Sequence, residues 1–262
     1  MSEREKMKAK RDLNNEIDKR IKGQAKSFGY KFRSPCAFAK QGEYFISSFC
    51  SVMTLEVAIV HIAVKKLIYD DIFWDVMNMS SNKDQPLSLR AVGAFTAPGI
   101  IVCRKEVPIF SDLDAFVESF YQTVIDESTR FLQENPLNDY ILSHEVEPWG
   151  GTLKCLVHLS CNDISSAISE AKTAIASGDH DGGFVNEGKG FFDWILFQFD
   201  HQEDASSPPA FSQVYQNVPI ESPQKKKDII AVDTPREKTS FLERIKEIVS
   251  HKKTELKQRK DC

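Results

Sequence analysis

The segment 55–66 constrains the fold most, because it is apolar on both faces of the strand that it predicts. Successive side chains of a strand point to opposite faces, so a strand apolar on both faces lies inside a sheet and is covered on both sides or nearly so. Segments 30–39 and 43–52 are also predicted strands, and short connections join all three into an antiparallel meander. Pro35 cannot donate to a strand ladder, so it favours an edge position for 30–39.

Further elements are predicted on either side of this meander. Apolar residues at spacings of three and four predict helices at 4–29, 70–79, 111–135 (capped by Ser111) and 163–177. Alternating residues predict two strands within 87–107 and another at 152–160, whereas 191–199 is either a buried helix or a buried strand. Together these elements predict an α+β fold with an antiparallel or mixed sheet and helices mainly on one face.

The composition changes after residue 202 and divides the chain into three parts. Residues 1–202 are the predicted α+β domain, and 203–233 are a linker or extended arm rich in proline and serine. Residues 234–262 are predicted to form a separate, basic amphipathic helix that begins with Thr234-Pro235. The predicted partner-binding residues of this C-terminal helix are Phe241, Ile245, Ile248, Val249, Lys252 and Lys253.

Charge is divided between the ends and the middle of the chain. Residues 1–33 contain 11 Lys and Arg against 5 Asp and Glu, whereas residues 34–235 contain 14 against 28. Basic, helix-patterned ends around an acidic domain indicate docking, either onto that domain or onto another acidic partner. Basic ends also fit phosphate contacts with nucleic acid, although no aromatic residues are interleaved with these charges.

Composition favours a cytoplasmic protein without a membrane partner. The longest apolar run, Leu55–Val64, is shorter than the roughly 18 residues of a membrane-spanning helix. The N-terminus is charged from Glu3 onward, so we expect no secretory signal. The six cysteines include no CxxC pair and are expected to be reduced thiols.

Short motifs give the chain a resemblance to a known family. A charged helix ends in Gly29-Tyr30-Lys31, a meander leads to Asp71-Ile72-Phe73-Trp74, and an alanine-rich helix precedes Gly182-Gly183-Phe184. In this order residues 5–200 resemble a group of uncharacterised bacterial cytosolic proteins, known only as a domain of unknown function. The resemblance implies an α+β fold and brings no catalytic residues with it.

Two motifs in one glycine-rich stretch imitate binding sites. Gly183–Lys189 matches the phosphate-binding pattern GxxxxGK, but Gly190 stands where a Ser or Thr would hold magnesium. A calcium loop that starts at Ser177 would lack its first Asp, and Gly188 would replace the Glu at its twelfth position. We therefore expect no cofactor and no calcium here.

A third motif has the spacing of a zinc site. Cys155, His158 and Cys161 lie close together in the sequence, but a strand at 152–160 would point His158 away from both thiols. Three ligands divided between two faces cannot meet on one tetrahedral ion. We expect no metal in this protein.

The best candidates for acid–base chemistry are His144, Glu145 and Glu147. They are polar, and they precede Trp149 and two flexible glycines in a predicted loop. No nucleophile stands beside them in the sequence, so a solvated loop is the alternative interpretation.

These features favour a non-catalytic protein over an enzyme. Our interpretation is a protein-binding or accessory subunit of a bacterial cytosolic system, of the immunity or defence type, which binds a protein partner or a second copy of itself. One alternative is a nucleic-acid-binding protein that uses its basic terminal helices. The other is a hydrolase centred on the 144–147 loop.

The C-terminal helix generates the first prediction. A buried Ile contributes roughly 1.5–3 kcal/mol, whereas an exposed ion pair contributes about 0–1 kcal/mol. Replacing Ile245 and Ile248 with Asp should therefore abolish partner binding or self-association, while reversing the charges of Lys252 and Lys253 should do much less. Sedimentation velocity measures the self-association of each variant, and a binding titration measures its partner binding. A larger effect of the lysine changes, together with steep salt dependence, would instead support nucleic-acid binding.

Overall fold

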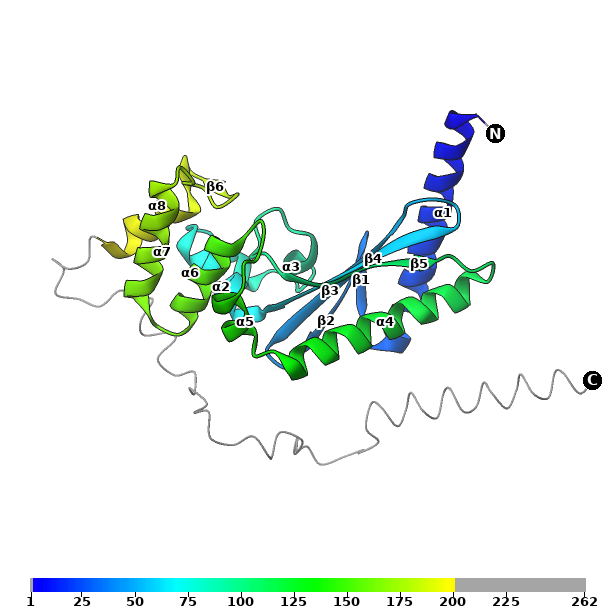
Figure 1. The fold of residues 1–262 in the computed structure, drawn as a ribbon, viewed down its shortest axis with the longest axis horizontal. Coiled ribbons are helices and arrows are strands. Elements are labelled where there is room, and N and C mark those ends of the chain that lie inside the picture. The colour runs from blue at the N-terminus through cyan, green and yellow to red at the C-terminus, as the bar shows by residue number, and fades with distance from the viewer. Residues whose placement is uncertain (1, 201–262) are drawn as a thin grey trace, which may run out of the picture. The chain divides into compact units, whose positions relative to one another are not determined.

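A five-stranded antiparallel sheet is the centre of the computed structural model, which describes residues 2–200 (Figure 1). The order of the strands across the sheet follows the chain, so β4 lies between β3 and β5, and β1 and β5 are the edges. The strands are β1 (Lys31–Arg33), β2 (Cys36–Gln41), β3 (Tyr44–Val52), β4 (Val57–Lys66) and β5 (Ile100–Pro108). The α+β fold with an antiparallel sheet is thus confirmed.

Helices precede and follow the sheet. α1 (Glu3–Gln24) continues into a 3-10 turn and ends at Gly29, whose φ is 79°. The other helices are α2 (Leu67–Val76), α3 (Leu89–Val92), α4 (Leu113–Glu134), α5 (Leu137–Ser143), α6 (Gly150–Ser160), α7 (Ile164–Ala176) and α8 (Phe191–Ile195). A small hairpin, β6 (Val185–Asn186) and β7 (Lys189–Gly190), precedes α8, and a π-helical turn, Leu196–Asp200, follows it. The predicted helices at 4–29, 70–79 and 163–177 correspond to α1, α2 and α7.

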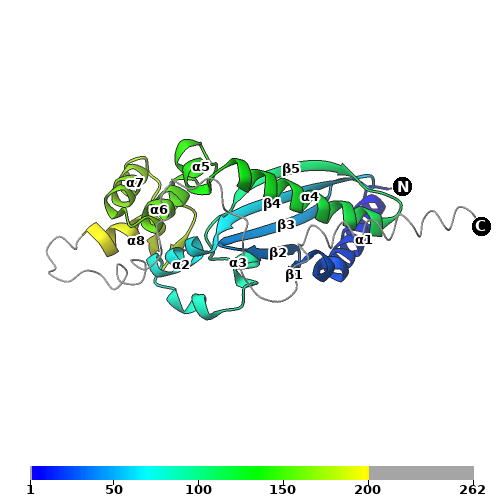
Figure 2. The same cartoon turned by 90° about the horizontal axis from the view of Figure 1, so that it is seen from below.

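One face of the sheet, the helix face, is closed by α1 and α4. Figure 2 shows α4 lying across the strands, with α1 at one end of the sheet. Val60, Ile62 and Val64 of β4 are fully buried on this face. Tyr121 of α4 donates a hydrogen bond of 2.8 Å to the carbonyl of Ile21 in α1, so the two helices are also joined to each other.

Among residues 2–200 the opposite face is covered in part, whereas 55–66 was predicted to be covered on both sides or nearly so: Ile59 of β4 is buried on this face, and His61 and Ala63 are half-buried. At one end a buried cluster lies on this face, formed by Cys36, Phe38 and Phe45 with Leu67, Leu87 and Ala91 packed against it. Farther along the strands, the exposed ring of Phe49 stacks on His61 at 4.4 Å, and Arg104 of β5 lies opposite His61. We call the area of Phe49, His61 and Arg104 the open sheet face.

The remaining helices form an end region around α2 (Figure 1). The ring of Phe73 in α2 stacks on Phe191 of α8, with the ring centroids 5.5 Å apart. The side chain of Gln198 donates a hydrogen bond of 2.7 Å to the carbonyl of Val76, the last residue of α2. This bond satisfies one of the carbonyls that the end of a helix leaves free.

The prediction of one strand over 30–39 is wrong, because the segment is a hairpin. β1 and β2 pair antiparallel with Phe32 opposite Ala37, and Ser34-Pro35 forms the turn between them. Proline donates no backbone hydrogen bond and fixes a φ that suits turns, so Pro35 ends a strand here. As a result Phe32 and Phe38 lie on opposite faces of the sheet.

The prediction of a strand at 152–160 is also wrong, because these residues form α6. Leu153, Leu156 and Leu159 recur every three residues and are buried, while Lys154 and His158, four apart, share a half-buried side. A helix that is buried over most of its circumference has few polar residues. In this sequence their spacing resembles the alternation of polar and apolar residues in a strand.

Three smaller predictions are corrected or decided by the structure. Within 87–107 the first predicted strand is the short helix α3, and only β5 is a strand. Asp112 rather than Ser111 caps α4, since its carboxylate accepts the backbone N–H of Asp114 at 3.0 Å. The run 191–199 is helical.

The predicted arm at 203–233 and helix at 234–262 lie outside the described residues. Among residues 2–200, no helix combines the length and apolar character needed to cross a membrane.

Replacing Gly183 with alanine should destabilise the domain more than the same change at Gly188. Both glycines have positive φ, 83° and 73°, which costs alanine about 1–2 kcal/mol. A Cβ at Gly183 would also overlap the ring of Trp149, whereas a Cβ at Gly188 meets nothing within 4 Å. We expect a further loss of about 1–3 kcal/mol at Gly183. Urea unfolding of both variants measures the difference, and equal losses would contradict this packing of Trp149.

Candidate interaction surface

The imidazole of His144 closes the end of α5 and contacts no predicted catalytic partner. Its Nδ1 lies 3.0 Å from the carbonyl oxygen of Tyr140, and its ring stacks on the Tyr140 ring at 4.2 Å. Ser143 Oγ is also 3.0 Å from Nδ1, but this hydroxyl donates to the carbonyl of Asp139 at 2.6 Å. Because the serine proton is directed into the helix, Nδ1 is not placed to remove it as a general base.

Glu145 and Glu147 are exposed, and neither carboxylate forms a hydrogen bond or ion pair with a residue in the range 2–200. The structure therefore brings His144 together with Ser143, and it brings neither carboxylate to the imidazole. General acid–base catalysis needs the reacting groups within hydrogen-bond reach of one another or of a bound substrate. The hydrolase interpretation remains a prediction without a positioned nucleophile.

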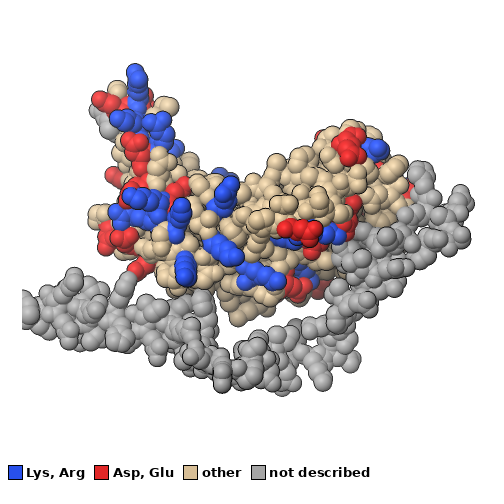
Figure 3. All heavy atoms as spheres, turned by 180° about the vertical axis from the view of Figure 1, so that it is seen from behind, with Lys and Arg blue, Asp and Glu red and all other residues tan. Residues whose placement is uncertain are grey.

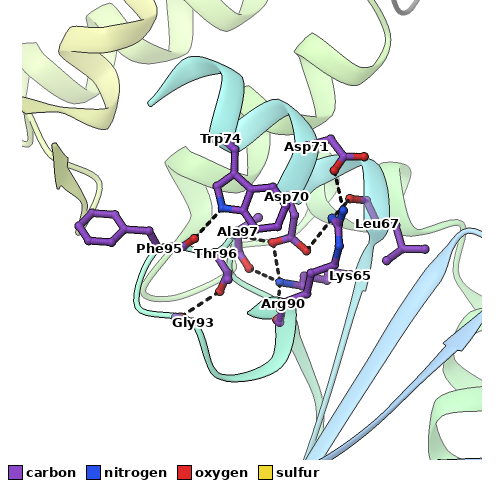
Figure 4. Close-up of polar contacts among 10 residues, drawn as sticks. All are labelled: Lys65, Leu67, Asp70, Asp71, Trp74, Arg90, Gly93, Phe95, Thr96 and Ala97. Carbon is purple, nitrogen blue, oxygen red and sulfur yellow. Dashed lines mark hydrogen bonds and ion pairs between the residues drawn. The ribbon is translucent and has the colours of Figure 1, made fainter. Parts of the chain in front are cut away.

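The most deeply buried polar cluster lies elsewhere, where β4 runs into α2 (Figure 4). Lys65, at the end of β4, donates hydrogen bonds to the Asp70 carboxylate at 2.8 Å and to the carbonyls of Arg90 and Ala97 at 3.0 and 2.9 Å. Asp70 in turn accepts the backbone N–H of Ala97 at 2.9 Å. A strand, a helix and the segment around α3 thus meet on one ammonium group.

Arg90 extends this ionic cluster toward the surface. Its guanidinium lies 3.3 Å from the Asp70 carboxylate and 2.7 Å from that of Asp71, and it donates to the carbonyl of Leu67 at 2.8 Å. It also lies over the indole ring of Trp74, 4.7 Å from the ring centroid. Arginine suits this position because its planar group forms several directed hydrogen bonds and stacks on an aromatic face.

The geometry of the ionic cluster indicates a structural role. Burial lowers the pKa of Lys65 and raises the pKa of Asp70, while the opposite charge of each partner counteracts both shifts. All three protons of the Lys65 ammonium have fixed acceptors, and both side chains are buried. A nucleophilic lysine needs a free lone pair and access to substrate. The cluster instead fastens α3 and its flanking loops over one end of the sheet.

In the described residues, neither the cysteines nor the glycine-rich stretch has the arrangement of a metal or nucleotide site. Cys155 is buried inside α6, and Cys161 is exposed at its end. Among the described residues, no group of three His, Cys, Asp or Glu side chains is arranged to hold a metal ion.

Lys189 lies over the rings of Trp194 and Phe197, 4.8 and 4.9 Å from their centroids. The turn before Lys189 joins two strands, β6 and β7. A phosphate-binding loop instead leads from a strand into a helix.

Exposed apolar side chains gather where the first half of α1 passes the turn between β3 and β4. Met7, Met53 and Leu55 are 70 %, 48 % and 41 % exposed. Together they line a hollow of about 510 Å³ between helix and turn. Methionine is flexible and polarisable, so its exposure beside other apolar side chains is typical of adaptable protein-binding surfaces.

Basic side chains lie on one side of these apolar residues, along α1, while Glu3 and Glu56 also line their hollow. An adjoining hollow of about 920 Å³ on α1 is lined by Met7 together with Arg4, Lys8, Lys10 and Arg11. Figure 3 shows Lys and Arg gathered along α1, with fewer acidic residues among them. We call the two hollows together the α1 groove. The sequence signalled its charge through the basic N-terminus, but the contribution of Met53 and Leu55 depends on the hairpin turn and was missed.

The helix α1 that forms the groove is fixed at both of its ends. Ile17 and Ile21, in the second half of α1, are buried against the sheet, and Asn14 accepts the backbone N–H of Val52 at 3.1 Å. The first turn of the helix is capped by Ser2, in a reciprocal pair of hydrogen bonds with Glu5. The helix therefore extends past the sheet with its backbone hydrogen bonds satisfied (Figure 1).

The predicted partner-binding residues of the C-terminal helix, 241–253, lie outside the described residues. Comparison of the chain with protein-family models, with curated proteins and with solved structures finds no match in any of the three. The resemblance of residues 5–200 to uncharacterised bacterial proteins therefore depends on the short motifs alone.

Replacing Lys65 with methionine should destabilise the domain by about 3–5 kcal/mol, because Asp70 would keep a buried charge without the ammonium that donates to it at 2.8 Å, and the longer Arg90 contact would be the ion pair that remains. Lys172→Met is the matched control, since its ion pair with Asp200, at 2.9 Å, lies at the surface. An exposed pair of this kind contributes about 0–1 kcal/mol. Chemical denaturation of both variants gives the two free energies of unfolding. Similar values for the two would show that the ionic cluster does not hold the α3 segment.

Proposed function

We propose that this protein is a non-catalytic binding protein that recognises an acidic segment of a protein partner through the α1 groove. We further propose that it acts as an accessory or immunity-type subunit in the bacterial cytoplasm. The observation that carries the proposal is the joint exposure of Met7, Met53 and Leu55 in a hollow lined also by Lys6, Lys10, Glu3 and Glu56, directly beside a hollow whose charged residues are all Lys or Arg. Such a surface offers apolar contact area and charge complementarity at one place.

The apolar component favours a protein partner over a nucleic acid. Nucleic-acid surfaces combine basic groups with aromatic side chains on which bases stack. The α1 groove instead has two methionines and a leucine between its charges, and these fit the aliphatic and aromatic side chains of an amphipathic peptide. The charges would then select a partner with Asp or Glu beside its apolar residues.

The proposal predicts that Met53→Asp combined with Leu55→Asp weakens binding to the native partner at least tenfold. Two apolar contacts would be lost, and two carboxylates would meet an acidic partner. The partner is first identified by stoichiometric co-purification with the full chain, and calorimetry then measures its affinity for each variant. Val185→Asp, which replaces an exposed apolar residue of β6, is the control and should bind as the natural chain does.

Two results would contradict the proposal. Unchanged affinity of the Met53 and Leu55 variant would show that the partner binds another surface. Binding of a 20-nucleotide single strand that falls steeply with salt, and that Lys8→Glu with Arg11→Glu abolishes, would assign the basic residues of α1 to nucleic acid.

A further inference from the structure

Among residues 2–200, no further strand pairs with the outer edge of β5, and eight of its nine residues pair with β4 on the inner side, Val102 being left out at a register shift. β5 is the last strand in the order of the sheet and pairs with β4. Figure 2 shows it along one rim of the sheet. Its central residues, Arg104, Lys105 and Glu106, are exposed. A free edge pairs with another strand through main-chain hydrogen bonds unless side chains prevent it.

Charged residues on an edge usually prevent such pairing, but the charges of β5 complement one another. Arg104 and Glu106 point to the same face of the sheet, because they lie opposite His61 and Ile59 of β4. Consider a second β5 running antiparallel, with the two-fold axis passing through Lys105. Arg104 of each copy then lies opposite Glu106 of the other, which gives two opposite-charge pairs.

The same register is also favourable on the helix face. Cys103 and Val107 lie opposite Ile62 and Ala58 of β4, so they point toward the buried side, and both are half-buried. In the two-fold register, Cys103 of each copy would lie opposite Val107 of the other copy. Lys105 alone would lie opposite itself, and its long side chain can extend away from the axis.

Neighbouring registers lack this complementarity. An axis through Arg104 or Glu106 creates one like-charge pair, as the axis through Lys105 does, but neither aligns Arg104 with Glu106 of the other copy. Exposed Ile101 and Phe110 flank the pairing segment and would lose solvent contact in the dimer. We propose that the protein forms a homodimer by antiparallel β5–β5 pairing centred on Lys105, which joins the two sheets into one. This inference does not depend on the α1 groove.

Sedimentation velocity of the full chain over a range of micromolar concentrations tests the dimer. Arg104→Glu and Glu106→Arg should each raise the dissociation constant at least tenfold, because each creates two like-charge pairs. A mixture of these two variants should form a heterodimer close to natural affinity, since both of its cross-strand pairs are again of opposite charge. Recovery in the mixture also shows that each variant is folded. Arg33→Glu, on the other edge strand, is the control and should leave dimerisation unchanged.

A chain that stays monomeric at all of these concentrations would overturn the proposal. So would a dimer that neither single variant weakens, because it would then use another surface. Weakening by both variants without recovery in their mixture would also exclude this register.

Discussion

The buried ammonium of Lys65 is the interaction on which the arrangement of the domain depends. It fixes the junction of β4 and α2 to the segment that contains α3, Asp70 neutralises its charge, and Arg90 forms ion pairs with Asp70 and Asp71. Several kcal/mol oppose the burial of each isolated charge, so these groups stay buried only while all three segments remain together. The position of the segment around α3 decides which part of the sheet is covered, and hence where the open sheet face begins.

The described residues present two surfaces that combine apolar side chains with charge, the α1 groove and the outer edge of β5. Within residues 2–200 the buried Lys65 ammonium donates to three fixed acceptors, and His144 is engaged with the end of its own helix. Exposed apolar side chains lie together at the α1 groove and beside the edge of β5, in addition to others elsewhere on the domain such as Phe49 and Val185. Both surfaces combine apolar area with arranged charge, as expected of protein contacts that form reversibly.

The sequence predicted those features that depend on local burial periodicity. The central strand, the meander and four of the helices follow from residues that repeat every two or every three to four positions. The hairpin at Ser34-Pro35 and the helix at 150–160 were missed, because one depends on turn geometry and the other is buried on most sides. The ionic cluster was also missed, since Lys65, Asp70 and Arg90 meet only after three segments have packed. For the same reason Met53 and Leu55 gave no signal of the α1 groove.

α1 contains 22 residues and is therefore about 33 Å long, but its burial against the sheet begins only near Asn14. Its projecting half is basic, whereas residues 34–200 contain 11 Lys and Arg against 23 Asp and Glu. The domain is thus an electric dipole with its positive end on a rigid arm. An acidic molecule approaching within a Debye length, about 8–10 Å, is repelled by most of the domain and attracted by this arm. Orientation is in this way imposed on a partner before any contact forms.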